Sequence, residues 1–448
     1  MTDGCSFIAV VNIVIIPFPP SPAIAVRSYF VFIIHDIGYF CKAYYYFRKG
    51  DQDMYVFFLL LALLFLLVVL IWVDLTLGRK HSKRSAVNRL IGHKHAFVSI
   101  FDDGISFYDA LIRDIKAAQQ SVDIQFFLVK WDEPTQQLVD LLQQRAQEGI
   151  KVRFLLDRIG GYRLPQKERK LLRQSGVMLR FANIPRFPYL LYNLNFRNHR
   201  KVTIIDQKSV YIGGFNIGKE YLSKEPRFGF WRDCVVKLEG EAVYSFVQLF
   251  ATDWGTPFRI LPKQAPSFDG AQVEVVITEA DGYEDWLLHQ IHHARNYLYI
   301  GTPYCVPTRR VERALKRASE RGVDVRLMLP SKVDHYVVNQ VSFHFARRLL
   351  QHGVRINLYQ NGFYHAKIVL CDDSWCAVGS ANLDGRSLLI NKEITITIRQ
   401  NDLFYAQLFD LWNKDERSSI DASMHDMQKR PWIAKATGIL FRPLRNYL

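Results

Sequence analysis

The sequence carries two matching segments, and this pair decides the fold. The first reads His199-Arg-Lys-Val-Thr-Ile-Ile-Asp206 and is followed by Gly213-Gly-Phe-Asn216. The second reads His365-Ala-Lys-Ile-Val-Leu-Cys-Asp372 and is followed by Gly379-Ser-Ala-Asn382. Both follow the pattern His-x-Lys-x4-Asp, then six residues, then Gly-[Gly/Ser]-x-Asn. Because the order and the spacing agree, the sequence predicts a duplicated unit rather than two unrelated motifs.

The duplication extends upstream of both segments. The run GIKVRFLL at Gly149–Leu156 matches GVDVRLML at Gly322–Leu329. Each half alternates β-prone apolar runs with runs of helical periodicity, as where Ser121–Val129 precedes a helix that begins at Pro134. This alternation predicts an α/β fold of two pseudo-symmetric halves, each a mixed β-sheet flanked by helices.

One long apolar run stands upstream of the two halves. Residues 54–73 read MYVFFLLLALLFLLVVLIWV and contain no charge. Twenty helical residues rise about 30 Å, the thickness of a bilayer core, so the run predicts a transmembrane helix. Basic residues flank it on both sides, with more of them downstream, which favours a cytoplasmic location for the C-terminal portion.

The order of these features predicts five parts of the chain. A Pro/Gly/Ser-rich stretch over residues 261–270 separates the halves. For the segment upstream of the apolar run, a second span, a re-entrant piece and an interfacial segment all remain open. The parts are an apolar and aromatic segment (1–53), a transmembrane helix (54–73), a basic linker (74–97), a first half (98–266) and a second half with a basic amphipathic tail (267–448).

Composition narrows the class of partner. The formal net charge is +15, from 58 Lys and Arg against 43 Asp and Glu, which indicates an anionic partner, either nucleic acid or an acidic membrane. The apolar fraction of 49% and the charged fraction of 23% exclude disordered and fibrous classes. None of the six cysteines forms a CxxC pair or another metal-ligand spacing, so we expect neither a metal site nor a cofactor.

The paired motifs also predict a chemistry. In a strand, His and Lys two residues apart point to the same face, so two related halves can bring both pairs to one shared site. An imidazole serves as a nucleophile or as a general acid near neutral pH, and ammonium and amide groups bind phosphate oxygens without a metal. This combination predicts displacement at a phosphodiester, where one His attacks phosphorus and the other protonates the leaving alcohol. The candidate groups are His199, Lys201, Asn216, His365, Lys367 and Asn382.

The aspartates that close the two motifs have two open interpretations. Asp206 and Asp372 stand where a predicted strand enters a turn. Aspartate commonly caps such turns by accepting backbone hydrogen bonds. Direct contact with the substrate fits the sequence equally well, so both residues belong to the candidate catalytic set.

The doubled motif resembles the phospholipase D superfamily, whose two HKD motifs carry a metal-free ping-pong transfer. The resemblance covers roughly residues 95–448. Within that superfamily the sequence is similar to the bacterial cardiolipin synthases. The segments that carry this similarity are Gly213–Tyr221, Trp231–Asp233, Gly379–Ser387 and Asn391–Glu393.

The resemblance implies transfer of a phosphatidyl group from one phosphatidylglycerol to the glycerol headgroup of another, through a phosphohistidine. It implies that His199 is the nucleophile, that His365 is the acid and base, and that Asp233 and Glu393 each orient an imidazole. It also implies an anionic phospholipid substrate, no nucleic acid partner, and a location in the bacterial inner membrane with the catalytic portion facing the cytoplasm. The alternatives are a phospholipase D-type hydrolase acting on phospholipid or nucleic acid, and a lipid-binding scaffold without activity.

Two further segments have features of membrane-surface contact. The first half has eleven residues more than the second just before its HKD motif, within a stretch over residues 181–197 that is rich in aromatics and leucine. This insertion either lies at the bilayer interface or packs on its own domain. The tail over residues 430–448 likewise mixes basic with large apolar side chains.

Overall fold

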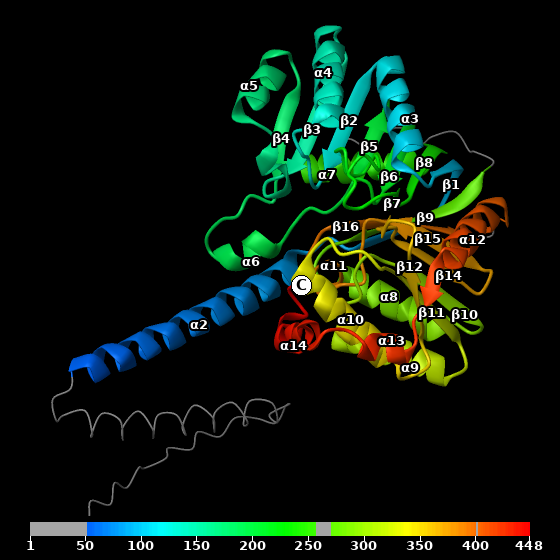
Figure 1. Ribbon diagram of the computed structural model, residues 1–448. Coiled ribbons are helices and arrows are strands. Elements are labelled where there is room, and N and C mark those ends of the chain that lie inside the picture. The colour runs from blue at the N-terminus through cyan, green and yellow to red at the C-terminus, as the bar shows by residue number, and fades with distance from the viewer. Residues whose placement is uncertain (1–51, 257–269, 400–401) are drawn as a thin grey trace, which may run out of the picture. The chain divides into compact units, whose positions relative to one another are not determined.

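The computed structural model describes residues 52–256, 270–399 and 402–448 (Figure 1). The predicted N-terminal segment before residue 52 lies outside the described residues, as does most of the boundary stretch over residues 261–270. By its internal contacts the chain divides after Ile71, and Trp72–Leu448 forms one compact unit.

Helix α2 (Gln52–Ser85) contains the predicted span. Within the described residues, it is the one helix long and apolar enough to cross a membrane. Its leucines are strong helix formers, and Lys83 and Arg84 lie in the last turn, where cations favour the helix dipole. The expected basic linker over residues 74–97 is instead structured: residues 74–85 continue α2, and residues 89–97 belong to strand β1 (Arg89–Phe101).

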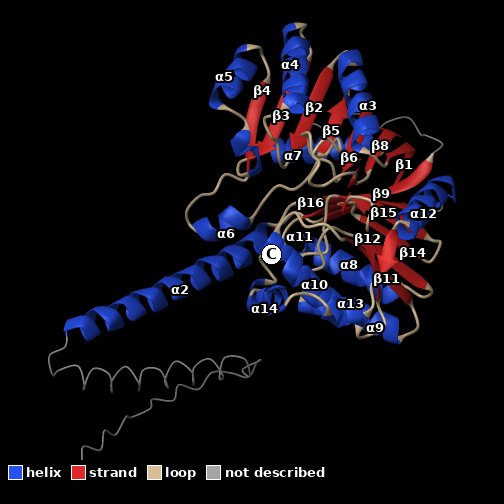
Figure 2. Cartoon of the chain, viewed as in Figure 1, coloured by secondary structure: helices blue, strands red, loops and turns tan. Residues whose placement is uncertain are grey.

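The two halves repeat the same alternation of strands and helices (Figure 2). The first half contains β1, α3 (Gly104–Ala117), β2 (Ser121–Phe126), α4 (Glu133–Gln147), β3 (Lys151–Asp157), η1 (Gly160–Arg163), α5 (Gln166–Gln174), β4 (Met178–Ala182), α6 (Leu190–Asn195), β5 (Val202–Ile205), β6 (Ser209–Gly213), β7 (Trp231–Arg232), β8 (Val235–Gly240) and α7 (Val243–Trp254). The second half contains β9 (Ala271–Thr278), α8 (Gly282–His293), β10 (Tyr297–Gly301), α9 (Arg309–Glu320), β11 (Asp324–Pro330), α10 (Tyr336–Leu350), β12 (Arg355–Tyr359), β13 (Phe363–Tyr364), β14 (Ile368–Cys371), β15 (Trp375–Gly379), α11 (Gly385–Leu389), β16 (Glu393–Arg399), α12 (Asp402–Arg417), β17 (Ser419–Asp421), α13 (Met424–Gln428), α14 (Trp432–Leu440) and η2 (Arg442–Leu444).

The larger sheet runs through both halves without a break. Its fifteen strands have the order β17-β12-β11-β10-β14-β15-β16-β9-β1-β8-β6-β5-β2-β3-β4. Reading outward from the antiparallel β1–β9 pair, the two halves present equivalent strands in the same order. Neighbouring strands are parallel within β2-β3-β4 and within β10-β11-β12, and antiparallel nearer the centre. The predicted α/β fold of two pseudo-symmetric halves with mixed strands and flanking helices is therefore confirmed, and the strands of both halves form one sheet.

A shared core explains why the halves form one unit. One cluster of buried residues joins Phe246 and Phe250 of α7 to Leu408 and Trp412 of α12, together with strands of both halves. Burying each such side chain contributes about 1.5–3 kcal/mol. Because these contacts cross between the halves, neither half keeps its full core without the other.

Buried charges also cross between the halves. Within the first half, Arg200, between His199 and Lys201, is buried and places Nη1 2.8 Å from both carboxylate oxygens of Asp253 on α7. Lys392 of the second half lies 3.2 Å from the same carboxylate. Arg232 of the first half pairs with Asp415 of the second, with Nε 2.8 Å from Oδ1. Unpaired buried charges are costly, so these pairs fix the halves in one arrangement.

Candidate active site

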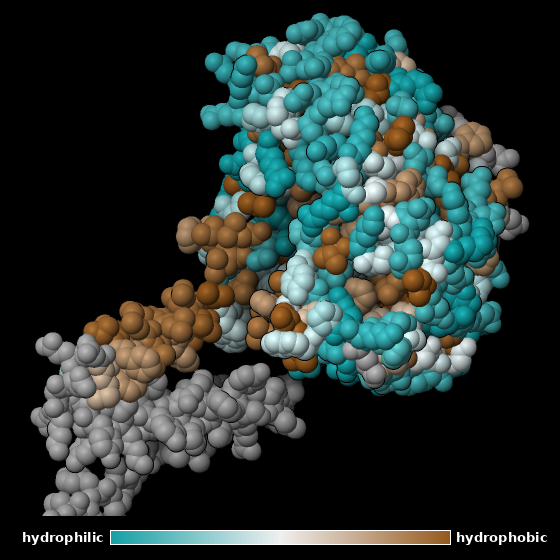
Figure 3. Space-filling model, viewed as in Figure 1, coloured by the Kyte–Doolittle hydropathy of each residue, from teal (hydrophilic) through white to brown (hydrophobic). Residues whose placement is uncertain are grey.

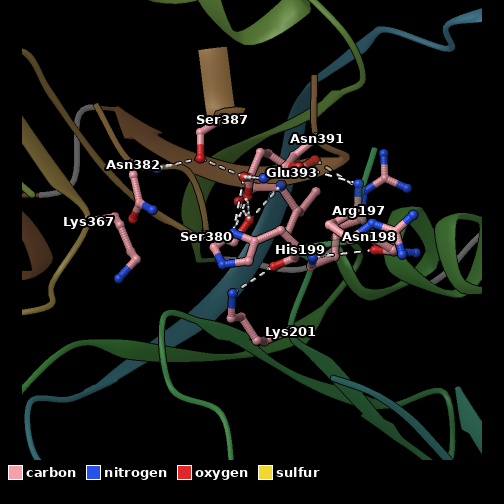
Figure 4. A network of polar contacts seen from close by, with 12 residues as sticks. Arg197, Asn198, His199, Lys201, Lys367, Ser380, Asn382, Ser387, Asn391 and Glu393 are labelled. Carbon is pink, nitrogen blue, oxygen red and sulfur yellow. Dashed lines mark hydrogen bonds and ion pairs between the residues drawn. The ribbon is translucent and has the colours of Figure 1, made fainter. Parts of the chain in front are cut away.

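The histidine of the first motif is held by the second half. His199 precedes β5, and its Nδ1 lies 3.0 Å from both oxygens of Glu393, the first residue of β16 (Figure 4). Its backbone N–H donates to the carbonyl of Lys392 at 3.0 Å. Both contacts join residues of opposite halves.

The histidine of the second motif is held by the first half in the equivalent way. Nδ1 of His365 lies 2.5 Å from Oδ2 of Asp233, and the His365 backbone N–H donates to the carbonyl of Arg232 at 2.7 Å. The short strands β7 and β13 pair in parallel just before these residues. The structure thus shows which carboxylate contacts which histidine, which the sequence left open.

The sheet register explains why Asp233 and Glu393 are equivalent. Asp233 stands two residues before Val235, which pairs with the last residue of β6. Glu393 stands two residues before Thr395, which pairs with the last residue of β15. The same local geometry therefore presents a carboxylate from each half to the histidine of the other.

These contacts define the tautomer of both imidazoles. An ionised carboxylate can only accept a hydrogen bond, so each Nδ1 carries the proton and donates it. Each Nε2 then keeps its lone pair, which is the form required of a nucleophile or a general base. The carboxylate contact is equivalent for His199 and His365, but Nδ1 of His365 also lies 2.7 Å from Nζ of Lys367.

Burial favours the neutral form of both imidazoles. Burial lowers the pKa of His199, and the charge of Glu393 only partly opposes this effect. Burial and the neighbouring Lys367 lower the pKa of His365 to about 4, against the opposing effect of Asp233. A bound phosphate would bring negative charge beside both rings and raise both pKa values.

The two lysines belong to the same electrostatic environment. Nζ of Lys201 donates to the carbonyl of His199 at 2.8 Å, and Nζ of Lys367 lies 2.7 Å from Nδ1 of His365. Burial lowers the pKa of Lys201 to about 7 and that of Lys367 to about 8. The charge of the lysine in the other half also lowers the pKa of each histidine. The structure therefore brings the predicted two histidines and two lysines together.

The carboxylates are themselves held in place. Glu393 is fully buried and accepts hydrogen bonds from Ser380 Oγ at 2.5 Å and Ser387 Oγ at 2.7 Å. On the other side, a Cβ at Gly214 would lie 2.1 Å from Oδ1 of Asp233, so this position requires glycine. Burial alone would raise the pKa of both carboxyls, but the adjacent His and Lys groups lower it. Glu393 and Asp233 therefore stay ionised.

The two asparagines keep donors free for a ligand. Nδ2 of Asn216 donates to the Tyr221 hydroxyl at 3.2 Å, and Nδ2 of Asn382 donates to Asp384 at 2.9 Å. Each amide nitrogen carries a second hydrogen. Asn216 and Asn382 can therefore each offer one N–H to a phosphate oxygen.

Asp206 and Asp372 cap turns. Asp206 accepts the backbone N–H groups of residues 119, 120 and 121 at 2.7–2.8 Å, and Asp372 does the same with residues 295, 296 and 297. Both residues have a positive φ, 52° and 54°. The strand β5 separates Asp206 from Lys201, a distance of about 16 Å at 3.3 Å per residue. Of the two open interpretations, this geometry favours turn capping over substrate contact.

This assignment predicts a separation between stability and chemistry. We expect Asp206→Ala to lower the free energy of unfolding by about 1–2 kcal/mol, because three N–H groups lose their acceptor. Asp206→Asn keeps an acceptor, and asparagine tolerates the left-handed backbone, so the free energy of unfolding of this variant should lie between those of Asp206→Ala and wild type. Thermal melting and kcat measured on the folded fraction test this pair. A loss of kcat beyond about tenfold in Asp206→Asn would return the residue to the catalytic set.

Aromatic rings flank the two imidazoles. The Phe127 ring contacts His199 edge-on with centroids 5.0 Å apart, and the Trp231 ring lies 5.0 Å from His365. Phe127 carries no sequence signal, because it stands in an ordinary β-prone run. In the described part of the chain, no three His, Cys, Asp or Glu side chains group as metal ligands.

The insertion before His199 has a buried and an exposed side. Tyr192 of α6 is buried in the core, and its backbone N–H donates to Oδ1 of Asp74 on α2 at 2.8 Å. Phe187, by contrast, is 83% exposed, and Ile184 and Leu194 are also exposed. Figure 3 shows apolar surface over α6. Part of this stretch therefore packs on the protein itself, and part of it has the exposed apolar side chains expected of contact with a bilayer interface.

Comparisons with known proteins agree with this architecture. A family described as "Cardiolipin synthase, PLD-like domain" matches residues 111–254 and 287–412. The chain is 33% identical over 399 residues to "Minor cardiolipin synthase ClsB" of Bacillus subtilis, covering 88% of this chain and 100% of that one. It is 39% identical over 308 residues to "Cardiolipin synthase A" of Pseudomonas aeruginosa, covering 67% of this chain and 63% of that one. The crystal structure of phosphatidylserine synthase from Haemophilus influenzae shares the fold, with a TM-score of 0.65 and 14% identity over 83% of this chain and 100% of that one.

Proposed function

The chain belongs to the cardiolipin synthase family of PLD-like proteins, and on this premise we propose that it makes cardiolipin from two phosphatidylglycerol molecules and releases glycerol. The observation that carries the proposal is the crossed pair of His–carboxylate contacts, His199–Glu393 and His365–Asp233. It provides two neutral imidazoles with free Nε2 atoms beside two lysines. Such a set suits a two-step transfer at a phosphodiester.

In the first step, Nε2 of His199 attacks the phosphorus of phosphatidylglycerol. The bond from phosphorus to the glycerol oxygen breaks, and His365, protonated in the presence of the bound phosphate, gives its Nε2 proton to that oxygen. The products are free glycerol and a phosphatidyl group bonded to His199. Glu393 stabilises the positive charge that develops on the attacking imidazole.

In the second step, the other substrate replaces glycerol. His365, now neutral, removes a proton from a headgroup hydroxyl of a second phosphatidylglycerol. That oxygen attacks phosphorus, and the bond to His199 breaks to give cardiolipin. In both steps Lys201, Lys367 and the asparagine N–H groups stabilise charge on the non-bridging oxygens.

The proposal places the enzyme on the bacterial inner membrane. Helix α2 provides one segment of sufficient length, and the basic residues after it favour a cytoplasmic position for the catalytic unit. The substrate is then an anionic lipid of the same membrane, and the positive net charge of the chain suits that surface.

Product analysis tests this function. The purified full-length protein is incubated with radiolabelled phosphatidylglycerol in mixed micelles, and lipids and glycerol are resolved. Cardiolipin and glycerol in equal amounts are expected. Phosphatidic acid as the main product would instead identify a hydrolase, and cleavage of added DNA without lipid turnover would identify a nuclease.

The lysine pKa values predict an alkaline limit to activity. A lysine is charged below its pKa, so the phosphate-binding charges are lost as pH rises through about 7 for Lys201 and about 8 for Lys367. We expect kcat/KM for phosphatidylglycerol, which reports the free enzyme, to fall above about pH 7 and more steeply above about pH 8. Arginine stays charged over this pH range, so an active Lys201→Arg variant should show the decline in kcat/KM at a higher pH than wild type. A profile that stays flat to pH 9.5 would contradict the prediction.

The exposed side of the insertion predicts an effect that depends on the lipid surface. We expect Phe187→Ser to reduce activity on phosphatidylglycerol vesicles several-fold, because an exposed aromatic is lost from the membrane interface. Activity on dispersed short-chain phosphatidylglycerol should stay unchanged. Leu403→Ser, at an equally exposed site on α12, is the matched control. Equal activity of both variants on vesicles would argue against interfacial contact by this residue.

A further inference from the structure

A strongly basic pocket lies between the end of α2 and the second half, formed by side chains other than those of the HKD motifs. It has a volume of about 790 Å³ and is formed by α2, the start of α9, α10 and the C-terminal turn η2. Eight cationic and only two acidic side chains line it. The cationic residues are Arg79, Arg309, Arg310, Arg313, Lys316, Arg348, Arg442 and Arg445.

The two acidic side chains neutralise only part of this charge. Glu312 pairs with Lys316, Arg348 and Arg445 at 2.8–3.1 Å, and these cations lower its pKa to about 2. Glu284 pairs with Arg310 at 2.7 Å.

The remaining cations have no acidic partner in the described part of the chain. They are Arg79, Arg309, Arg313 and Arg442. Cations gathered in one pocket repel one another, so the pocket favours an anion with several oxygens.

The position of Arg79 points to the membrane surface as the source of that anion. Arg79 follows Val73, the last residue of the apolar run, by six helical residues, or about 9 Å. The headgroup layer extends about 5–8 Å beyond the hydrocarbon core. With the apolar run in the core, a long arginine side chain at this position reaches the phosphates.

The C-terminal wall of the pocket is also suited to lipid. Leu440 and Leu444, on either side of Arg442, are 70% and 48% exposed. Alternation of arginine with exposed leucine is typical of segments at a bilayer interface, where the apolar groups enter the acyl boundary. A nucleic acid backbone would gain nothing from these leucines.

We propose that this pocket binds the phosphate headgroup of an anionic phospholipid that is not undergoing reaction. It is a second lipid site, formed by residues that take no part in the transfer, and it secures the catalytic unit to an anionic membrane. The inference goes beyond the proposed function and rests on it for the position of α2 in the membrane and for the transfer at the HKD residues.

Counting bound lipids tests the proposal. The full-length protein carries His199→Ala and His365→Ala in every sample, so that no lipid is consumed, and is titrated with phosphatidylglycerol in neutral detergent before native mass spectrometry. The pocket variant adds Arg309→Gln, Arg313→Gln and Arg442→Gln. The matched control adds Lys167→Gln, Lys170→Gln and Arg173→Gln, three exposed bases of α5 that form no ion pair within the described residues.

We expect the pocket variant to retain one phosphatidylglycerol fewer than the control at equal lipid, or to require at least tenfold more lipid for the same occupancy. Phosphatidylcholine should bind weakly and equally to both. Arg442→Gln alone, at an exposed turn, should weaken binding about threefold, which separates loss of the site from misfolding.

Three results would overturn the proposal. Equal phosphatidylglycerol occupancy in the pocket variant and the control would show that the pocket holds no lipid. Displacement of the lipid by 10 mM inorganic phosphate would identify a site for soluble anions. Displacement by single-stranded DNA at low micromolar concentration would identify a nucleic acid site.

Discussion

Replacing His199 with alanine is expected to abolish cardiolipin formation, by about 10⁴-fold or more in kcat, and to remove the covalent intermediate. The variant keeps Glu393 and both lysines but has no Nε2 to attack phosphorus. Removal of the nucleophile in other covalent enzymes costs a factor of this size or larger. Acid-quenched mass spectrometry of enzyme mixed with phosphatidylglycerol is the decisive measurement, because it shows the adduct and the residue that carries it.

The partner variant distinguishes the two histidines. His365→Ala should still form the phosphatidyl adduct on His199, slowly, because the leaving glycerol oxygen lacks its proton donor. His352→Ala, at an exposed histidine after α10, should behave as wild type and serves as the control. An adduct found on His365 in wild type, or retained in His199→Ala, would reverse the assigned roles.

Replacing Asp253 with alanine is expected to give the largest loss of stability. The Asp253 side chain is fully buried and pairs with Arg200 and Lys392, so its removal leaves these two cations sharing the carboxylate of Glu279, at 3.4 and 3.1 Å. Breaking a buried pair in this way costs about 3–5 kcal/mol. Thermal melting of the full-length protein in detergent measures the effect as a lower melting temperature or loss of folded protein.

A surface ion pair is the matched comparison for this variant. Glu225 pairs with Lys219 at 3.1 Å, and both side chains are substantially exposed. Such pairs contribute about 0–1 kcal/mol, so Glu225→Ala should melt close to wild type. If Asp253→Ala had the same melting temperature as Glu225→Ala, the buried charges around Asp253 would not contribute to the stability of the fold.

The duplicated motif was the most informative part of the sequence. It predicted the pseudo-symmetric α/β halves and the gathering of His199, Lys201, His365 and Lys367, because residue order within a repeat is local information. It could not predict which carboxylate meets which histidine. Those contacts join residues 194 and 132 positions apart and depend on how the halves face each other.

Other features had no local signal at all. The β1–β9 pair joins the strands of both halves into one continuous sheet, but the sequence of neither strand indicates that the two pair with each other. Composition could not separate Tyr192, which is buried against α2, from the exposed Phe187 five residues earlier, because both are aromatics in the same stretch. The role of Asp206 was ambiguous for a similar reason, since an aspartate that follows a strand can either cap a turn or contact a ligand.

The crossed carboxylates also bear on how such an enzyme could have arisen. A single half carries both a histidine and a carboxylate, but each carboxylate contacts the histidine of the other half, so one copy alone would be incomplete and two identical copies would have to associate. Joining the copies in one chain removes the requirement that they stay identical. The present chain has used that freedom: Asp233 packs against a glycine, whereas Glu393 is bound by two serines. Covalent fusion therefore permits specialisation, because the surroundings of the two equivalent histidines can change independently of each other.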